Sequence, residues 1–288
     1  NYVNLPILFQ YIKKNNIPVI WTLHDCWSFT GQCPYFTMKK CLKWQTGCYE
    51  CPQINIYPSS YIDRTRIMWK LKKKWFEGVE NLIIVTPSHW LANLVKESYL
   101  KNYDVKVIHN GIDLEIFHPT LNNFREKYKI DMSKKIVLGV AFDWGVRKGL
   151  DIFIRLAQEL DGEKYQIVMV GTDDTIDKEL PNNVLTIHKT NNQIQLAEIY
   201  TAADVFVNPT REENYPTVNM EAIACGTPVI TFNTGGSPEI LRKNTGLVIP
   251  CDDFNALKLS IKKVCETQMF SERDCVEYAK IFDKDTKY

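Results

Sequence analysis

Short apolar runs alternate with segments of helical spacing along most of the chain. Continuous apolar runs predict buried strands, whereas apolar residues three and four positions apart predict amphipathic helices. The predicted strands are residues 19–23, 82–85, 105–108, 136–141, 166–170, 184–187, 205–208, 228–232 and 247–249. The predicted helices are residues 5–15, 61–79, 149–160, 193–202, 217–225 and 255–266, with one more helix capped by Ser88. Because short apolar strands that alternate with helices form parallel sheets covered on both faces, the pattern predicts an α/β fold.

The periodic pattern pauses around Pro119, and we place a domain boundary there. A chain of 288 residues is long enough for two Rossmann-like domains, which would be residues 1–118 and 119–288. Residues 26–57 are irregular and rich in Cys, Pro and Gly. We therefore predict a long loop there, of the kind that is either functional or held in place by something else.

Composition narrows the class of protein. A net charge of +1 argues against a protein that binds nucleic acid through bulk charge. No apolar run reaches the roughly 18 residues that a membrane span needs. Residues 1–10 lack the pattern of a signal peptide, and since the chain does not begin with Met we expect that a natural start precedes it. Singly scattered cysteines fit a reducing compartment, so we expect a cytoplasmic protein, either free or at the inner face of the membrane.

The loop that follows strand 205–208 contains a candidate ligand site. Ligands of open parallel sheets bind at the carboxyl ends of the strands, and residues 211–221 follow such an end and open a helix. Amides at a helix start bind phosphate. Thr217 and Glu221 share one helix face, so they can offer a hydroxyl to a phosphate and a carboxylate to a ribose. An acidic loop before an ordinary helix start explains the same residues equally well.

Two further strand ends carry suitable residues. Arg147 and Lys148 precede Gly149 after strand 136–141, and two cations beside a glycine suit a pyrophosphate. Gly235 and Gly236 follow strand 228–232 and can turn their amides toward a ligand. Each segment alone is weak evidence, because Lys-Gly pairs before helices and tight glycine turns are both common.

Taken together, these segments resemble the motifs of the retaining GT-B glycosyltransferases of the family 4 group. Glu213 and Glu221 match its Glu-x7-Glu motif. The other matching stretches are residues 109–113 (His-Asn-Gly-Ile-Asp), 226–229 (Gly-Thr-Pro-Val) and 235–239 (Gly-Gly-Ser-Pro-Glu). Residues 21–27, with the cysteine-rich loop after them, resemble a bacterial subgroup that builds exopolysaccharide and surface polysaccharide. The resemblance covers nearly the whole chain, and the order and spacing of the motifs make it specific.

The resemblance implies a GT-B fold of two Rossmann-like domains and a role for each matching residue. The enzyme would move a sugar, with retention, from a nucleotide-diphosphate sugar to a saccharide or lipid-linked saccharide acceptor in surface polysaccharide synthesis. Arg147 and Lys148 would bind the donor diphosphate, Glu213 the sugar hydroxyls and Glu221 the ribose. The remaining expected contacts are His24 at the reacting sugar, Lys189 and Thr190 beside the base, and Asn214, Tyr215, Thr217, Val218, Gly235 and Gly236 around the donor.

The chain departs from the family at one position. An Arg usually stands five residues before the Lys of the Lys-Gly pair, and this sequence has Asp143 there. We expect Arg147 to supply the second cation instead. The resemblance implies that catalysis needs no metal or other cofactor, and the sequence has no evident Asp-x-Asp motif.

Three other classes remain open. They are a non-catalytic nucleotide-sugar binding module, a sugar-nucleotide epimerase of the same fold, and an NAD(P) dehydrogenase. No Gly-x-Gly-x-x-Gly follows a predicted strand, which argues against the dehydrogenase. An epimerase needs catalytic acids that the sequence does not identify.

Family members begin with a strand and a Gly-rich loop, and their C-terminal helices cross back to the first domain. This chain starts close to a helix and ends at Tyr288. We therefore expect an incomplete N-terminal domain with an exposed sheet edge, and poor activity of the chain by itself.

Cys33, Cys41, Cys48 and Cys51 form a Cys-x7-Cys-x6-Cys-x2-Cys pattern. The closing Cys-x2-Cys pair is typical of tetrahedral zinc, and four thiolates complete a structural site. Zinc would explain how a long loop stays ordered, and unligated thiols are the alternative.

The predicted helix 61–79 has a basic and an apolar face. The basic residues are Arg66, Lys70, Lys73 and Lys74, and the apolar ones are Met68, Trp69, Leu71, Trp75 and Phe76. Such a helix can rest on an anionic membrane surface near a lipid-linked acceptor. The alternative is that its apolar face packs on the core of the domain.

Overall fold

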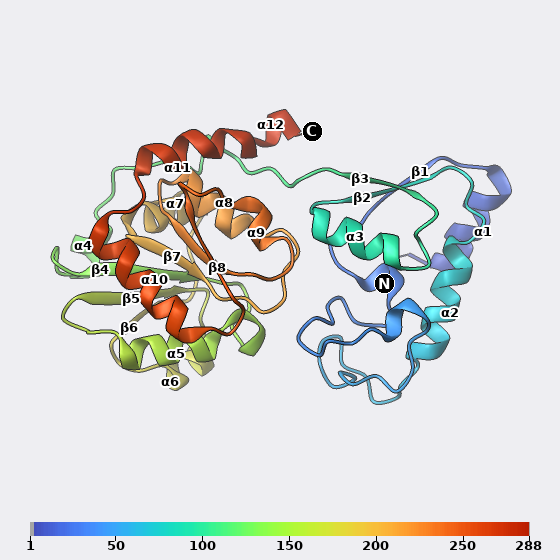
Figure 1. The fold of residues 1–288 in the computed structure, drawn as a ribbon, viewed down its shortest axis with the longest axis horizontal. Helices are drawn as coiled ribbons and strands as arrows, with labels where there is room; N and C mark the ends of the chain where they lie inside the picture. The colour runs from blue at the N-terminus through green and yellow to red at the C-terminus, as the bar shows by residue number, and fades with distance from the viewer. Residues whose placement is uncertain (1–2, 288) are drawn as a thin grey trace. The chain divides into compact units, whose positions relative to one another are not determined.

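The computed structural model describes residues 3–287, which form two compact units. The first unit ends at His109 and the second begins at Asn110. Figure 1 shows the helices and strands of each unit. Both units are α/β with parallel sheets, as the alternation of apolar runs and helices predicts.

The first unit has a three-stranded parallel sheet in the order β1-β2-β3. Its elements are α1 (Leu5–Asn15), β1 (Val19–Thr22), α2 (Thr65–Phe76), β2 (Leu82–Thr86), α3 (His89–Glu97) and β3 (Asp104–Val107). Two short 3-10 helices, η1 (Trp27–Phe29) and η2 (Lys43–Gln45), lie in the long connection between β1 and α2. Phe9 of α1, Phe76 of α2 and Ile84 of β2 share one apolar core, so both long helices pack onto the sheet.

The second unit has a six-stranded parallel sheet in the order β6-β5-β4-β7-β8-β9. Its strands are β4 (Lys135–Val140), β5 (Tyr165–Val170), β6 (Val184–Ile187), β7 (Val205–Asn208), β8 (Val229–Phe232) and β9 (Gly246–Ile249). Its helices are α4 (Phe124–Lys127), η3 (Val146–Lys148), α5 (Leu150–Glu159), α6 (Asp174–Glu179), α7 (Gln193–Ala202), α8 (Thr217–Ala224), α9 (Ser237–Ile240), α10 (Phe254–Thr267), α11 (Glu272–Ala279), η4 (Lys280–Phe282) and α12 (Lys284–Lys287).

Alternate side chains of the central strands enter two separate cores. Along β4, Ile136 and Leu138 belong to one core and Val137 to the other. This follows from the pleat of a strand, which points successive side chains to opposite faces. Both faces of the sheet are therefore covered, which is why its strands are apolar at nearly every position.

The junction between the units lies earlier than the predicted boundary at residues 118 and 119. Ile112 and Phe117 are buried in a core of the second unit, so the segment before Pro119 belongs to that unit. The Ile112 amide donates to the Phe282 carbonyl (2.8 Å), and the Lys284 amide donates to the Ile112 carbonyl (3.0 Å). Sequence periodicity could not reveal this pairing, because its two partners are far apart along the chain.

Helix α2 is shorter than predicted and its faces differ from the expected pattern. Trp69 and Phe76 are buried in the first unit, and the Trp69 indole donates to the Trp44 carbonyl at 2.8 Å. The apolar face that membrane binding requires is therefore covered in part. Lys72, which the pattern left unassigned, is fully buried beside these residues. Within residues 3–287, no helix combines the length and the apolar character that crossing a bilayer needs.

Candidate functional site

The candidate site lies between β4 and β7 in the sheet of the second unit. This is the topological switch point, where the chain stops adding strands on one side of β4 and begins to add them on the other. The chain places β5 and then β6 on one side of β4, and afterwards places β7, β8 and β9 on the other side. The helices that follow β4 and β7 pack on opposite faces of the sheet, so the loops after these two strands lie at its topological switch point. Loop residues at the ends of these two strands are the first candidates for ligand contact.

Arg147 and Lys148 form the short turn η3 after β4, directly before α5. Gly149 ends this turn with a φ of +81°, a conformation that favours glycine. A side-chain carbon at Gly149 would lie 2.6 Å from the Pro209 ring and 2.8 Å from the Pro209 carbonyl. The close approach of Gly149 to the end of β7 thus brings the two cations to the switch point.

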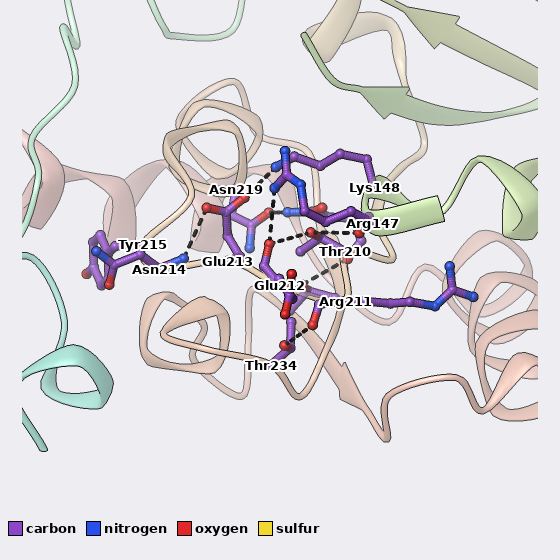
Figure 2. A network of polar contacts seen from close by, with 12 residues as sticks. Arg147, Lys148, Thr210, Arg211, Glu212, Glu213, Asn214, Tyr215, Asn219 and Thr234 are labelled. Carbon is purple, nitrogen blue, oxygen red and sulfur yellow. Dashed lines mark hydrogen bonds and ion pairs between the residues drawn. The ribbon is translucent and has the colours of Figure 1, made fainter. Parts of the chain in front are cut away.

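Backbone hydrogen bonds hold the turn of Arg147 against the loop that follows β7. The Arg211 amide donates to the Arg147 carbonyl at 2.8 Å. In the opposite direction, the Arg147 guanidinium donates to the Glu212 carbonyl at 3.3 Å. Figure 2 shows how these contacts join the two loops.

The Lys148 ammonium and the Glu213 carboxylate form an ion pair at 2.5 Å. Their side chains are only 20% and 14% exposed, so water screens this pair less than a surface pair. The second Glu213 oxygen accepts from the Asn214 amide at 3.1 Å. The Glu213 carboxylate is therefore fixed in orientation by contacts at both oxygens (Figure 2).

The glycine loop after β8 positions the acidic loop. Gly235 has a φ of +53°, and a side-chain carbon there would lie 1.6 Å from the Glu213 carbonyl oxygen. The Gly236 amide donates to the Asn214 carbonyl at 2.8 Å, and the Thr234 hydroxyl donates to the Arg211 carbonyl at 2.8 Å. The sequence predicted that the glycine amides turn toward a ligand. In the structure the Gly236 amide instead holds the loop that carries Glu213.

Helix α8 begins next to this loop. Pro216 is its N-cap residue and has an extended backbone (φ −71°, ψ 116°), so the helix starts at Thr217. Thr217 and Val218 are partly buried, and Asn214 and Tyr215 are buried just before them. The Asn110 amide group donates to the Tyr215 carbonyl at 3.3 Å and so ties the matching Asn-Gly segment to the helix start.

Glu221 lies one turn into α8 and is partly buried. The Tyr200 hydroxyl donates to its carboxylate at 3.1 Å, and the Thr217 hydroxyl also bonds it. Burial raises the pKa of Glu221 above its usual 4.5, while the two hydroxyl groups act in the opposite direction. The predicted pairing of Thr217 with Glu221 on one helix face is therefore confirmed.

Two buried asparagines connect β7 to α8. The Asn208 amide group donates to the Asn219 side-chain oxygen at 2.8 Å, and both residues are buried. The Asn219 side-chain nitrogen has no hydrogen-bond partner among the described residues. The sequence pattern did not single out either residue, although polar side chains at an apolar strand end and in a buried helix turn were the available signal.

The other predicted contacts follow β6 in the second unit and β1 in the first unit. Lys189 is exposed and Thr190 partly buried after β6, which lies three strand positions from β7, roughly 14 Å at the usual strand spacing. Asp177 accepts from the His188 ring at 2.7 Å and raises the pKa of His188. His24 is exposed and lies two residues after the end of β1 in the first unit. Asp143, at the position of departure from the family, is exposed after β4.

The geometry thus brings Arg147, Lys148 and Glu213 into one network, with the start of α8 adjoining it. Glu221 stands one turn along the same helix, where it faces Tyr200 rather than the ion pair. The arrangement offers two cations and a carboxylate at the switch point and a second carboxylate further along the helix.

The chain belongs to the family of group 1 glycosyl transferases, whose family model matches residues 122–282. A relative in Escherichia coli K12, provisionally named the colanic acid biosynthesis glycosyl transferase WcaC, is 28% identical over 257 residues. That match covers 86% of this chain and 61% of the relative. The chain spans between 48% and 61% of the length of three such curated relatives.

Solved glycosyltransferase structures share the fold. Sucrose-phosphate synthase from Thermosynechococcus elongatus matches with a TM-score of 0.72 at 23% identity, covering 98% of this chain and 68% of that one. Anabaena HepE, solved in complex with UDP-glucose, matches with a TM-score of 0.68 at 16% identity, covering 98% and 73%. The predicted GT-B class of fold is confirmed by these matches.

Replacing Gly235 by Ala tests the packing of the two loops. We expect Gly235→Ala to destabilise the second unit by about 2–3 kcal/mol, because the added carbon collides with the Glu213 carbonyl and the positive φ disfavours Ala. Thermal unfolding measures the loss. Gly162→Ala is the control, since nothing lies within 4 Å of a side-chain carbon there. Equal melting temperatures for the two variants would contradict the packing argument.

Proposed function

We propose that this chain is the donor-binding part of a retaining glycosyltransferase. The enzyme moves a sugar from a nucleotide-diphosphate sugar to a saccharide or lipid-linked saccharide in surface polysaccharide synthesis. The observation that carries the proposal is the Lys148–Glu213 ion pair at the switch point of a group 1 glycosyl transferase domain. The WcaC relative's name supports the polysaccharide context, and the HepE complex with UDP-glucose supports a nucleotide-sugar donor.

The order of charges matches the order of groups along such a donor. The diphosphate and the sugar are adjacent in a nucleotide sugar, and a cation and a carboxylate are adjacent in the Lys148–Glu213 pair. Lys148 and Arg147 bind the diphosphate, while Glu213 accepts hydrogen bonds from the sugar hydroxyls. Thr217 and Val218 at the start of α8 contact the distal phosphate.

Glu221 accepts hydrogen bonds from the ribose one helix turn further along, and Lys189 and Thr190 lie beside the base. Asn214, Tyr215 and the glycine loop hold these contacts in place by the backbone bonds already described.

The transfer step needs charge stabilisation more than it needs a protein nucleophile. The bond between the sugar carbon and the diphosphate oxygen breaks, and its electron pair moves to the diphosphate. The acceptor oxygen bonds the same carbon from the same face, and its proton passes to the departing diphosphate. Arg147, Lys148 and the α8 start stabilise the developing negative charge, so their effect is greatest in the transition state.

A lipid-linked acceptor would bring the enzyme to an anionic membrane surface. Arg66, Lys70 and Lys74 of α2 are exposed, whereas Trp69 and Phe76 are buried. We propose that any contact of α2 with such a surface is electrostatic, and an electrostatic contact weakens as salt is added.

Binding of donors to the purified protein tests the proposed function. We expect one nucleotide sugar of a panel of UDP-, GDP- and ADP-sugars to raise the melting temperature by several degrees, because ligand at 100 times Kd stabilises by about 2.7 kcal/mol. Binding without transfer to any acceptor would favour the binding module over the enzyme. Absence of a shift with every nucleotide sugar and with free UDP, GDP and ADP would refute a nucleotide site.

Substitution of the two glutamates separates their roles. We expect Glu213→Gln to lower kcat about 10- to 100-fold with little change in nucleotide affinity, because its contacts are with the transferred sugar. Glu221→Ala should weaken nucleotide binding about tenfold, since it removes a charged hydrogen-bond acceptor worth at least 1.4 kcal/mol. Glu163→Gln is the exposed control. The role assignment is wrong if both variants keep wild-type donor kinetics.

The raised pKa of Glu221 predicts a pH dependence of nucleotide binding. The ionised carboxylate accepts hydrogen bonds from the ribose hydroxyl groups. The affinity for the nucleotide therefore rises as pH rises through the raised pKa of Glu221, and then levels off. Isothermal calorimetry with UDP across this range measures the dependence. The nucleotide itself titrates, so the Glu221→Gln variant serves as the reference. An identical pH profile for the two proteins would show that Glu221 does not bind the ribose.

A further inference from the structure

Four cysteines of the long loop in the first unit surround one very small cavity. Cys33, Cys41, Cys48 and Cys51 all line it, and its volume is about 20 Å³. A cavity of this size holds roughly one water-sized atom. The four thiols, which are spread over the loop between β1 and α2, therefore converge on a space for a single ion.

A backbone amide of the loop is aimed at one of these sulfurs. The Gly31 amide donates to the Cys48 sulfur at 3.1 Å. The Thr30 hydroxyl donates to the Cys33 carbonyl and the Gln53 side chain donates to the Tyr35 carbonyl, both at 2.6 Å, so these groups hold the backbone around the sulfurs. Hydrogen bonds donated to sulfur stabilise a thiolate and orient it as a metal ligand.

A buried cation lies beside the same cluster. Lys72 of α2 is 0% exposed, and its ammonium donates to the Trp27 carbonyl at 2.7 Å and to the Thr30 carbonyl at 3.1 Å. None of the ion pairs among the described residues includes it.

The neighbours of Lys72 that can carry a negative charge are the thiols of Cys33 and Cys48 and, with a smaller effect, the Asp25 carboxyl. A buried ammonium without an opposite charge is strongly destabilising. A zinc ion with four thiolates carries a net charge of −2, so it would supply the missing negative charge. A second cation, Lys43, also lines the cavity and donates to the Tyr49 and Glu50 carbonyls.

We propose that Cys33, Cys41, Cys48 and Cys51 bind one structural zinc ion in the cavity that they line. The ion binds as four thiols lose four protons and form four zinc–sulfur bonds. Among residues 3–287, no three His, Cys, Asp or Glu side chains form a metal-binding group as they now lie. Rotation about one torsion angle moves each cysteine sulfur, and the proposal requires that zinc binding select the rotamers that bring the four sulfurs together.

Zinc would cross-link a loop that is otherwise poorly supported. Between Thr30 and Arg64 the described chain has only the short helix η2 as regular structure. The loop follows His24 and Asp25 directly, and Lys72 holds its start through the carbonyls of Trp27 and Thr30. The metal therefore positions the segment at the carboxyl end of β1.

Metal analysis of the full chain, purified without chelator, tests this site. We expect about one zinc per chain by mass spectrometry, and a thiolate-to-cobalt charge-transfer band when cobalt replaces the zinc. Chelation should lower the melting temperature, because metal binding is coupled to folding. Less than about 0.2 zinc per chain, together with no cobalt band, would overturn the proposal. Disulfides among the four cysteines in freshly prepared protein would overturn it as well.

Variants of one ligand separate coordination from folding. Cys51→Ser should lose most of the zinc, whereas Cys51→His should retain it, because imidazole is also a zinc ligand. Cys251→Ser is the control, since Cys251 is exposed in the second unit and should leave the zinc content unchanged. If Cys51→Ser fails to fold, the cobalt charge-transfer band of the wild-type chain still tests thiolate coordination, and its absence would count against the zinc site. Equal zinc content in all three variants would overturn the assignment of Cys51.

Discussion

One ion pair, between the Lys148 ammonium and the Glu213 carboxylate, joins the two loops on which the rest of the site depends. The two residues are 65 positions apart and follow the neighbouring strands β4 and β7. Because both side chains are largely buried, neither charge could be removed without leaving the other poorly solvated. The pair therefore fixes the geometry of a cation beside an anion at the switch point of the sheet.

Backbone contacts support this pair more than other side chains do. Gly149 lets the turn of Arg147 and Lys148 approach Pro209, and Gly235 lets the loop after β8 approach Glu213. The Gly236 and Arg211 amides then close hydrogen bonds between the loops. These contacts hold the loops of the site together, and charge stabilisation in a transition state requires groups that are preorganised in this way.

The two units show different ways of ordering a loop. In the second unit, short loops are fixed by the strand ends that flank them and by glycine contacts across the sheet edge. In the first unit, the loop between β1 and α2 is long, and Lys72 of α2 is buried beside the thiols of Cys33 and Cys48. Zinc coordination would cross-link that loop and so hold it in one conformation, as backbone hydrogen bonds hold a strand or a helix.

The sequence by itself determined the strands, seven of the helices and the class of fold, whereas α4, α6, α9, α11 and α12 were not predicted. Apolar runs located every strand to within about two residues, because burial on both sides of a parallel sheet leaves a continuous local signal. It also named Arg147, Lys148, Glu213 and Glu221, since strand ends and helix starts are local features.

Only the tertiary structure decided which of these residues meet. It also decided that Glu221 faces Tyr200, and that the Gly236 amide bonds a loop rather than a ligand. The buried state of Lys72 and the pairing of Ile112 with the C-terminal segment were likewise beyond local pattern. The physical reason is that strand order and close backbone approach depend on contacts between residues far apart in the chain, and periodicity carries no information about them.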